Sequence, residues 1–128
     1  MENNNLREQI LFTANADPKK CMKCGKCSGA CPNYDEMEYH PHQFVSMVQN
    51  GDIEPLLKSE SLYLCLTCMV CVERCPRNVQ PARFIEAVRL AKIRQQGENR
   101  LTPQQIPAKI EEDTPQQLLV SAFRKYTK

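Results

Sequence analysis

The feature that most constrains this chain is a cysteine pattern that occurs twice. Each copy reads Cys-x-x-Cys-x-x-Cys-x-x-x-Cys-Pro, and together the two copies use all eight cysteines of the 128-residue sequence. Three closely spaced thiolates, with a fourth just before a proline, are the bacterial-type signature for a [4Fe–4S] cluster. Two copies therefore predict two clusters. The predicted ligands are Cys21, Cys24, Cys27 and Cys31 of the first motif, and Cys65, Cys68, Cys71 and Cys75 of the second.

The pattern also predicts how these ligands are shared. Three cysteines in a tightly coiled backbone present their sulfurs to one side, so the fourth iron of a cube needs a ligand from elsewhere. In two-cluster ferredoxins the fourth cysteine of each motif binds the other cluster. We therefore predict one cluster on Cys21, Cys24, Cys27 and Cys75, and the other on Cys65, Cys68, Cys71 and Cys31.

Two other interpretations of the cysteines are less favoured. A disulfide framework needs an oxidising compartment, and the first five residues, Met-Glu-Asn-Asn-Asn, do not resemble a secretory signal. Zinc sites usually combine two separated Cys-x-x-Cys pairs rather than three cysteines in a row and a Cys-Pro. Reduced thiols and iron–sulfur clusters are thus favoured, the expected location is the cytoplasm, and a zinc-bearing binding module stays the alternative that metal analysis separates.

Length and charge narrow the function classes. A chain of 128 residues with a formal charge of +2 predicts one small domain, and two anionic clusters bring the loaded protein close to neutral. Free ferredoxins are usually strongly acidic, so near-neutrality favours a subunit of a complex. Basic residues are not interleaved with aromatic ones, which argues against nucleic-acid binding. No apolar run is long enough for a membrane span, and no catalytic constellation is recognisable.

The hydrophobic pattern predicts helices and no strands. Apolar residues recur at helical spacing before the first motif, and again after Pro41 up to a stop signal at Asn50-Gly51. Asp52 is expected to cap a further short helix, and the clearest helix is predicted from about Pro81 to Gln96. The predicted fold class is all-α, an α-helical ferredoxin-like domain at 21–97. Residues 1–20 form a predicted helical extension, and 98–128 a C-terminal extension that we expect to dock a partner.

Both motifs resemble those in the C subunit of heterodisulfide reductases. The resemblance rests on Cys-Met-Lys-Cys-Gly-Lys-Cys-Ser-Gly-Ala-Cys-Pro from Cys21, a helical spacer with Met-Val-Gln-Asn-Gly from Met47, and the second motif ending in Cys-Pro-Arg-Asn-Val at Val79. It covers about half of the chain. More distant relatives with the same helical two-cluster fold are the iron–sulfur subunits of flavin dehydrogenases.

This resemblance implies a position in a chain of electron carriers. The expected function is electron relay through two [4Fe–4S] clusters, between a flavin-containing iron–sulfur subunit and a cysteine-rich catalytic subunit that reduces a disulfide. The chain itself is then a non-catalytic subunit of an oxidoreductase. The alternatives are the iron–sulfur subunit of a flavin dehydrogenase that feeds quinone, and a free ferredoxin.

Other residues near the motifs invite specific expectations. His40 and His42 flank Pro41, where a capping or polar role is favoured over a metal or proton role. Cations close to a cluster can either be solvated surface or raise the cluster's potential. Sequence position divides these cations between the clusters, with Lys19, Lys20, Lys23 and Lys26 at the first and Arg74 and Arg77 at the second. The residues expected at partner junctions are Met22, Leu66, Met69 and Val70.

Overall fold

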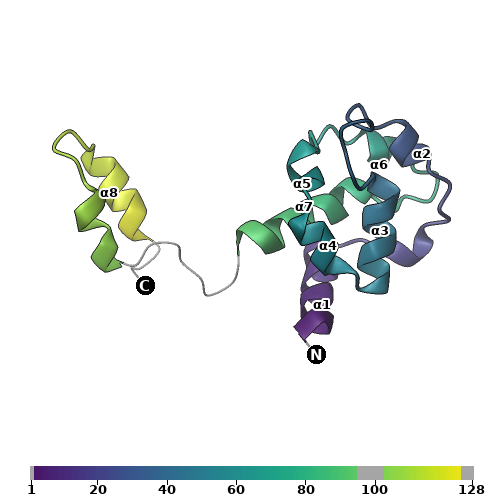
Figure 1. Ribbon diagram of the computed structural model, residues 1–128, viewed down its shortest axis with the longest axis horizontal. Helices are drawn as coiled ribbons and strands as arrows, with labels where there is room; N and C mark the ends of the chain where they lie inside the picture. The colour runs from purple at the N-terminus through teal and green to yellow at the C-terminus, as the bar shows by residue number, and fades with distance from the viewer. Residues whose placement is uncertain (1, 95–102, 125–128) are drawn as a thin grey trace. The chain divides into compact units, whose positions relative to one another are not determined.

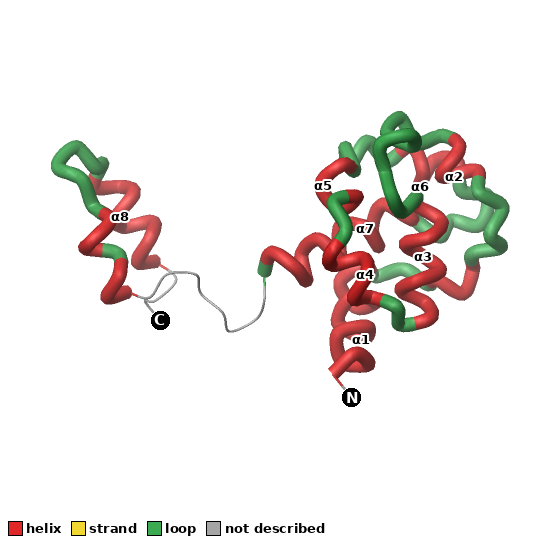
Figure 2. The backbone as a smooth tube through the Cα atoms, viewed as in Figure 1, coloured by secondary structure: helices red, strands yellow, loops and turns green. Residues whose placement is uncertain are grey.

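The computed structural model describes residues 2–94 and 103–124, and within these ranges the chain is helical with no strand (Figure 1, Figure 2). The predicted all-α class is therefore confirmed. The chain divides into two compact units, Met1–Gln95 and Gln96–Lys128. The first unit contains both cysteine motifs.

Three helices form the frame of the first unit. Helix α1 covers Glu2–Ala14, α3 covers Pro41–Asn50 and α7 covers Pro81–Ile93. Proline at the first position of α3 and α7 suits a helix start, because its φ is already helical and the missing N–H has no partner there. The shorter helices are α2 (Lys26–Gly29), α4 (Ile53–Lys58), α5 (Ser61–Leu64) and α6 (Val70–Arg74), with a 3₁₀ turn η1 at Pro18–Lys20.

Helix α7 is the centre of the core. It packs against α1, α3, α4, α5 and α6, and Phe84 and Val88 on its inner face are fully buried with Phe44 of α3. Burying side chains of this size stabilises the fold by roughly 1.5–3 kcal/mol each. The cysteine loops and the short helices α2 and α6 lie together at the end of the unit away from the start of α1 (Figure 1). The cysteine loops therefore lie at one end of the helical core, which holds them in position.

The predicted helix boundaries hold with two differences. Helix α3 ends at Asn50 and Gly51 follows in the left-handed conformation, with φ +90°, as its stop signal predicted. Helix α7 ends at Ile93 rather than near Gln96, because Arg94 leaves helical geometry while its N–H still bonds the Leu90 carbonyl. Asp52 occupies the N-cap position of α4, but its side chain makes no capping hydrogen bond.

The second unit contains two 3₁₀ turns, η2 at Pro103–Gln105 and η3 at Pro107–Lys109, and helix α8 at Gln116–Phe123. Leu118 and Val120 of α8 are exposed. In the described part of the chain, no helix has the length and apolar character that crossing a membrane requires.

Candidate metal centres

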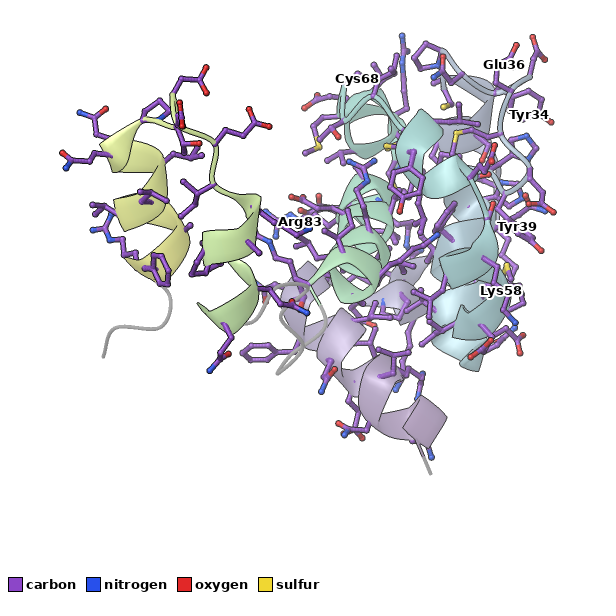
Figure 3. The ribbon with its side chains drawn as sticks, turned by 60° about the vertical axis from the view of Figure 1, so that its left-hand side comes forward. Tyr34, Glu36, Tyr39, Lys58, Cys68 and Arg83 are labelled. Atoms are coloured by element: carbon purple, nitrogen blue, oxygen red, sulfur yellow. The ribbon has the colours of Figure 1, made fainter. Side chains whose placement is uncertain are left out.

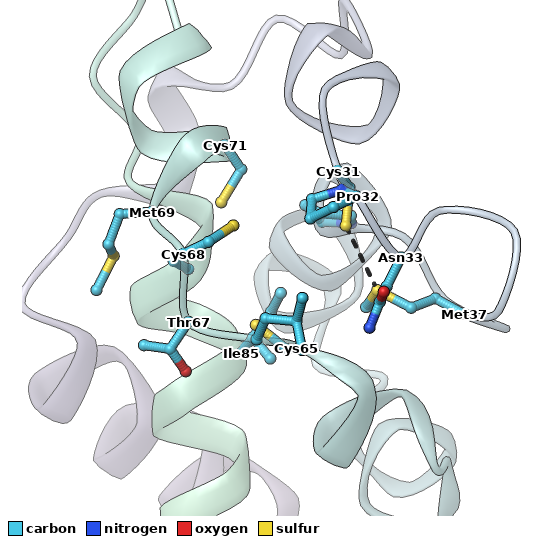
Figure 4. A pocket seen from close by; sticks show the side chains of 13 residues that line it. Cys31, Pro32, Asn33, Met37, Cys65, Thr67, Cys68, Met69, Cys71 and Ile85 are labelled. Carbon is cyan, nitrogen blue, oxygen red and sulfur yellow. Dashed lines mark hydrogen bonds between the residues drawn. The ribbon is translucent and has the colours of Figure 1, made fainter.

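The eight cysteines line two cavities, four to each. The first cavity is surrounded by three cysteines of the first motif and the last cysteine of the second. The second cavity has the complementary set, and Figure 4 shows its cysteines converging from two separate segments. The two hollows have similar sizes, about 340 and 370 Å³ including their open mouths. The cysteines are Cys21, Cys24, Cys27 and Cys75 at the first cavity, and Cys31, Cys65, Cys68 and Cys71 at the second.

The two loops that carry the first three cysteines have the same backbone geometry. Lys23 and Thr67, each two residues after the first cysteine, have φ values of +56° and +55°. Gly25 and Met69, each directly after the second cysteine, have φ values of +74° and +63°. Residues other than glycine rarely adopt this left-handed backbone conformation. Repeating it twice in each loop coils the backbone so that three cysteines face one cavity.

Exposure follows the same order in both loops. The second cysteines, Cys24 and Cys68, are exposed, whereas the third cysteines, Cys27 and Cys71, are each only 8% exposed. The remaining four are half-buried, and all eight are free thiols. Each cavity therefore has one wall in the interior and one thiol at the surface.

Burial keeps the interior thiols protonated when no metal is bound. It raises the pKa of Cys71 to about 11, with smaller contributions from neighbouring cysteines. Burial also raises the pKa of Cys27, and Cys21 and Cys75 add to it. Binding a metal cluster must displace these protons, because the thiolate is the ligand. Cys75 lies 48 positions after Cys27 in the sequence. It affects the pKa of Cys27 because both cysteines line the same cavity.

Backbone amides point at the sulfurs of the first cavity. The N–H of Lys23 donates to Cys21 Sγ and the N–H of Val79 donates to Cys75 Sγ, both at 3.4 Å. At the second cavity, Cys31 Sγ contacts Met37 Sδ at 3.7 Å, the dashed line in Figure 4. Hydrogen bonds to ligand sulfurs are among the factors that set the potential of an iron–sulfur centre.

A thin apolar wall separates the two cavities. Cys27, Cys71 and Ala82 form one buried cluster, against which Val72 packs. Pro81 lines the first cavity and Ala82 the second, so the first turn of α7 stands between them. The thirteen-residue α7 places the positive end of its dipole at this wall, which favours negative charge on either side.

One polar pair lies beside the first cavity. His42, which lines it, places Nδ1 2.5 Å from Ser28 Oγ, and its backbone N–H donates to the same oxygen at 3.2 Å. Ser28 Oγ also lies 4.0 Å from Cys27 Sγ. Burial, with His40 adding to it, lowers the pKa of His42, so its ring is neutral at pH 7. His40 occupies the N-cap position of α3, where its backbone N–H donates to the Gln43 side chain. Its ring nitrogens lie 3.0 Å from Gln43 Oε1 and from the Tyr34 carbonyl, which agrees with the expected capping or polar role.

Sequence reasoning missed the residues that hold the second loop in place. Arg89 of α7 donates from Nε to the Leu62 carbonyl at 2.6 Å and from Nη2 to the Cys65 carbonyl at 3.1 Å. Asn33 donates to the Leu64 carbonyl at 2.6 Å. An arginine in the middle of a helix and an asparagine after Cys-Pro carry no pattern that identifies such partners.

The donor set fits an iron–sulfur cluster better than a single ion. Within the described residues, no three His, Cys, Asp or Glu side chains converge closely enough to hold one metal ion. Instead, four thiols surround each hollow. A cubane cluster needs this arrangement, because each of its four irons takes one cysteine thiolate.

Residues 20–80 match the family model of the 4Fe-4S dicluster domain. This part, just under half of the chain, is similar to that domain. The two predicted [4Fe–4S] clusters are thereby confirmed as its cofactors, and the electron-transfer character of such centres applies to it. Which cysteine binds which cluster stays a prediction.

Several curated proteins, all named as parts of heterodisulfide reductases, are similar to this chain. The iron–sulfur C subunit of the CoB–CoM heterodisulfide reductase of Methanopyrus kandleri is 36% identical over 72 residues, which are 56% of this chain and 36% of the relative. The C2 subunit of the H(2)/formate:CoB-CoM heterodisulfide,ferredoxin reductase of Methanococcus maripaludis is 35% identical over 74 residues, 58% of this chain and 40% of the relative. The C subunit of the H(2):CoB-CoM heterodisulfide,ferredoxin reductase of Methanothermobacter thermautotrophicus is 33% identical over 85 residues, 66% of this chain and 44% of the relative.

The resemblance to the C subunit of heterodisulfide reductases is thus confirmed. In each of these three matches the chain spans less than half the length of the relative. Three of the four residues expected at partner junctions stand at the surface of the cysteine loops. Met22, Leu66 and Met69 are 54%, 63% and 38% exposed, and Val70 is half-buried.

Proposed function

We propose that this chain relays single electrons between two protein partners as a fixed subunit of a heterodisulfide-reductase-like complex. The observation that carries the proposal is the pair of four-cysteine cavities that share the Cys27–Ala82–Cys71 wall. When bound, a [4Fe–4S] cluster stores and releases one electron without a change of ligands. Two such centres on either side of one wall suit a relay.

We propose the crossed ligand sets predicted from the sequence. The cluster of the first cavity takes Cys21, Cys24, Cys27 and Cys75, and that of the second takes Cys65, Cys68, Cys71 and Cys31. The grouping of the cysteines around the two cavities supports this assignment. The protein's part in the relay is then to hold both centres at a fixed separation and to keep water out of the wall between them.

The exposed thiols and their apolar neighbours supply the contacts with partners. Cys24 and Cys68 bring each centre to the surface, and Met22 and Leu66 stand exposed beside them. Exposed methionine and leucine are a liability on a freely diffusing carrier and are common at protein interfaces. We therefore favour a subunit over a free ferredoxin.

The partners that we propose come from the resemblance. One is a flavin-containing iron–sulfur subunit, and the other is a cysteine-rich subunit that reduces a disulfide. The chain contributes no catalytic residue in this scheme, and we propose the cytoplasm as the location of the complex, because thiol ligands favour a reducing compartment.

Reconstitution with the two partners tests the proposal. The isolated chain, loaded anaerobically, should accept electrons from dithionite and convert no disulfide. Disulfide reduction by the catalytic partner should require both this chain and the flavin-containing partner. If the isolated chain reduced a disulfide or a quinone as fast as the assembled complex, or eluted without either partner from cells that contain both, the relay role would be wrong.

A further inference from the structure

The two cavities differ in the charges at their rims. Lys23 and Lys26 lie in the loop of the first cavity, and Arg77 lines that cavity directly; all three are exposed. The second loop, 65–71, contains no charged residue. The turn after Cys31, which lines the second cavity through Asn33 and Met37, instead carries exposed carboxylates that do not themselves line the cavity. They belong to Asp35, Glu36 and Glu38.

The exchange of fourth cysteines produces this difference. The turn after Cys31 lines the second cavity through Asn33 and Met37, on either side of Asp35 and Glu36. Glu36 stands at the surface beside Tyr34 in Figure 3. Conversely, the segment after Cys75 brings Pro76 and Arg77 to the first cavity. Arg77 therefore belongs with the first cavity, whereas its position in the sequence suggested the second.

Hydrogen bonding adds to the charge difference. Two sulfurs of the first cavity, on Cys21 and Cys75, accept backbone N–H bonds, and Ser28 Oγ lies near a third. At the second cavity, one backbone hydrogen bond, from Ala82 to Cys71, acts in the same direction. Positive charge and donors at the sulfurs both stabilise the additional negative charge of a reduced cluster, and so both raise its potential.

Screening by salt does not remove these contributions. The Debye length is about 8 Å at physiological ionic strength, and adjacent Cα atoms are about 3.8 Å apart. Lys23 precedes Cys24, Lys26 precedes Cys27, and Arg77 lines the first cavity. The residues that carry these charges are therefore next to predicted ligands in the chain or at the cavity itself. The hydrogen bond to Cys75 Sγ is partly buried and is screened less, whereas the one to Cys21 Sγ is exposed.

We infer that the cluster of the first cavity has the more positive reduction potential, so that electrons pass from the second cavity to the first. This rests on the proposed two-cluster relay and its crossed ligands. In the internal step, one electron leaves the reduced cluster of the second cavity, which is oxidised, and reduces the cluster of the first; no proton or bond is exchanged. The electron comes from a one-electron donor, such as a reduced flavin or iron–sulfur centre, that docks beside Leu66. The acceptor docks beside Met22 and Lys23.

Redox titration of the loaded full-length chain, followed by electron paramagnetic resonance, tests the inference. Cys24→Ser and Cys68→Ser each perturb one signal and so assign the two signals to the cavities. Two separate midpoint reduction potentials are expected, and the higher one should belong to the cluster of the first cavity. Combining Lys23→Gln, Lys26→Gln and Arg77→Gln should move that midpoint to a more negative value and narrow the gap. Asp35→Asn with Glu36→Gln should move the lower midpoint upward.

Lys58→Gln is the matched control for a single lysine, because Lys58 is 80% exposed and pairs with Glu54 on α4. It should leave both midpoints unchanged where Lys23→Gln moves one. Equal midpoints, a higher midpoint at the second cavity, or equal shifts from Lys23→Gln and Lys58→Gln would overturn the inference. Separate midpoints in a chain that fails to support disulfide reduction with its partners would leave the inference standing and reject the proposed function.

Discussion

The loops 21–27 and 65–71 have one backbone shape and two chemistries. Both place left-handed residues at the same two positions, yet one position is Gly25 in the first loop and Met69 in the second. Methionine gains nothing locally from a φ of +63°, and an L-residue there costs roughly 1–2 kcal/mol. The shape is therefore imposed by what the three cysteines must surround, while the side chains between them are free to set charge and partner contacts.

The largest effect expected from breaking this pairing is the loss of a whole cluster. A chain with both clusters contains about eight iron atoms, as two cubane centres require. Cys21→Ala combined with Cys75→Ala should retain about four, because both cysteines line the first cavity. Cys71→Ala combined with Cys75→Ala should retain almost none, because these cysteines line different cavities.

Iron and sulfide analysis after anaerobic reconstitution measures the outcome. The two double variants remove the same number of thiols, so each is the control for the other. If the Cys71 and Cys75 pair kept half of the iron while the Cys21 and Cys75 pair kept none, each motif would hold its own cluster and the crossed assignment would be rejected.

The next largest effect is a loss of stability when the contacts that anchor the loops are removed. These contacts differ between the two loops. The second loop is held from a distance by Arg89, and Arg89→Ala leaves the Leu62 and Cys65 carbonyls without these donors. An unsatisfied buried polar group costs about 1–3 kcal/mol. The first loop follows η1, whose Asp17 caps the Lys19 N–H at an exposed site, so Asp17→Ala should cost only about 1 kcal/mol.

Thermal unfolding and the rate of iron release to a chelator compare these variants. Arg89→Ala should lower the unfolding midpoint more than Asp17→Ala and should speed the release of iron. Arg83→Ala is the control on α7, because Arg83 is exposed and surface changes usually stay within about 0.5 kcal/mol. Equal effects of Arg89→Ala and Arg83→Ala would show that the hydrogen bonds from Arg89 do not stabilise the second loop.

A smaller effect on stability is expected at the left-handed position that is Gly25 in the first loop and Met69 in the second. Its sign should be opposite in the two loops. Gly25→Ala should destabilise the loaded chain by about 1 kcal/mol, because φ at this position is +74°. No protein atom lies within 4 Å of the added Cβ, so the protein itself opposes the alanine through its backbone conformation and not through a clash. Met69→Gly should stabilise it by up to about 1 kcal/mol. Thermal unfolding of both variants decides, and a stabilising Gly25→Ala would contradict the shared geometry.

The smallest effect concerns the other pair of left-handed positions. Thr67 is β-branched, which makes a positive φ more costly than it is for Lys23, while asparagine tolerates this region well. Thr67→Asn should therefore raise the unfolding midpoint slightly, and Lys23→Asn should raise it by less. Thermal unfolding of the two variants measures both midpoints. A larger increase in the midpoint for Lys23→Asn than for Thr67→Asn would contradict this prediction.

Much of the frame follows from sequence patterns because those patterns are local. Pro41 and Gly51 bound α3 as expected, since one favours a helix start and the other permits a left-handed cap. The cysteines also lie around the two cavities in the sets that the crossed assignment groups together, while which cysteine binds which cluster stays a prediction. Helix α5 at Ser61–Leu64 was not predicted, because its four residues are too few to show a helical period.

Contacts between distant segments could not be predicted in the same way. Arg77 was assigned to the second centre by its distance along the chain, although it follows Cys75 and so travels with that cysteine to the first cavity. The left-handed residues Thr67 and Met69 are likewise invisible in the sequence, because neither residue type favours that conformation. Arg77 is placed by a contact between the two halves of the chain, whereas Thr67 and Met69 take their conformation from the cavity that their loop lines.

Each cavity draws three cysteines from one half of the chain and one from the other. Under the proposed crossed ligation, a fragment with a single motif lacks the last ligand of its own centre and is not a working one-cluster module. Deleting either motif would then take a ligand from both centres, so the two halves of the domain have to be kept together.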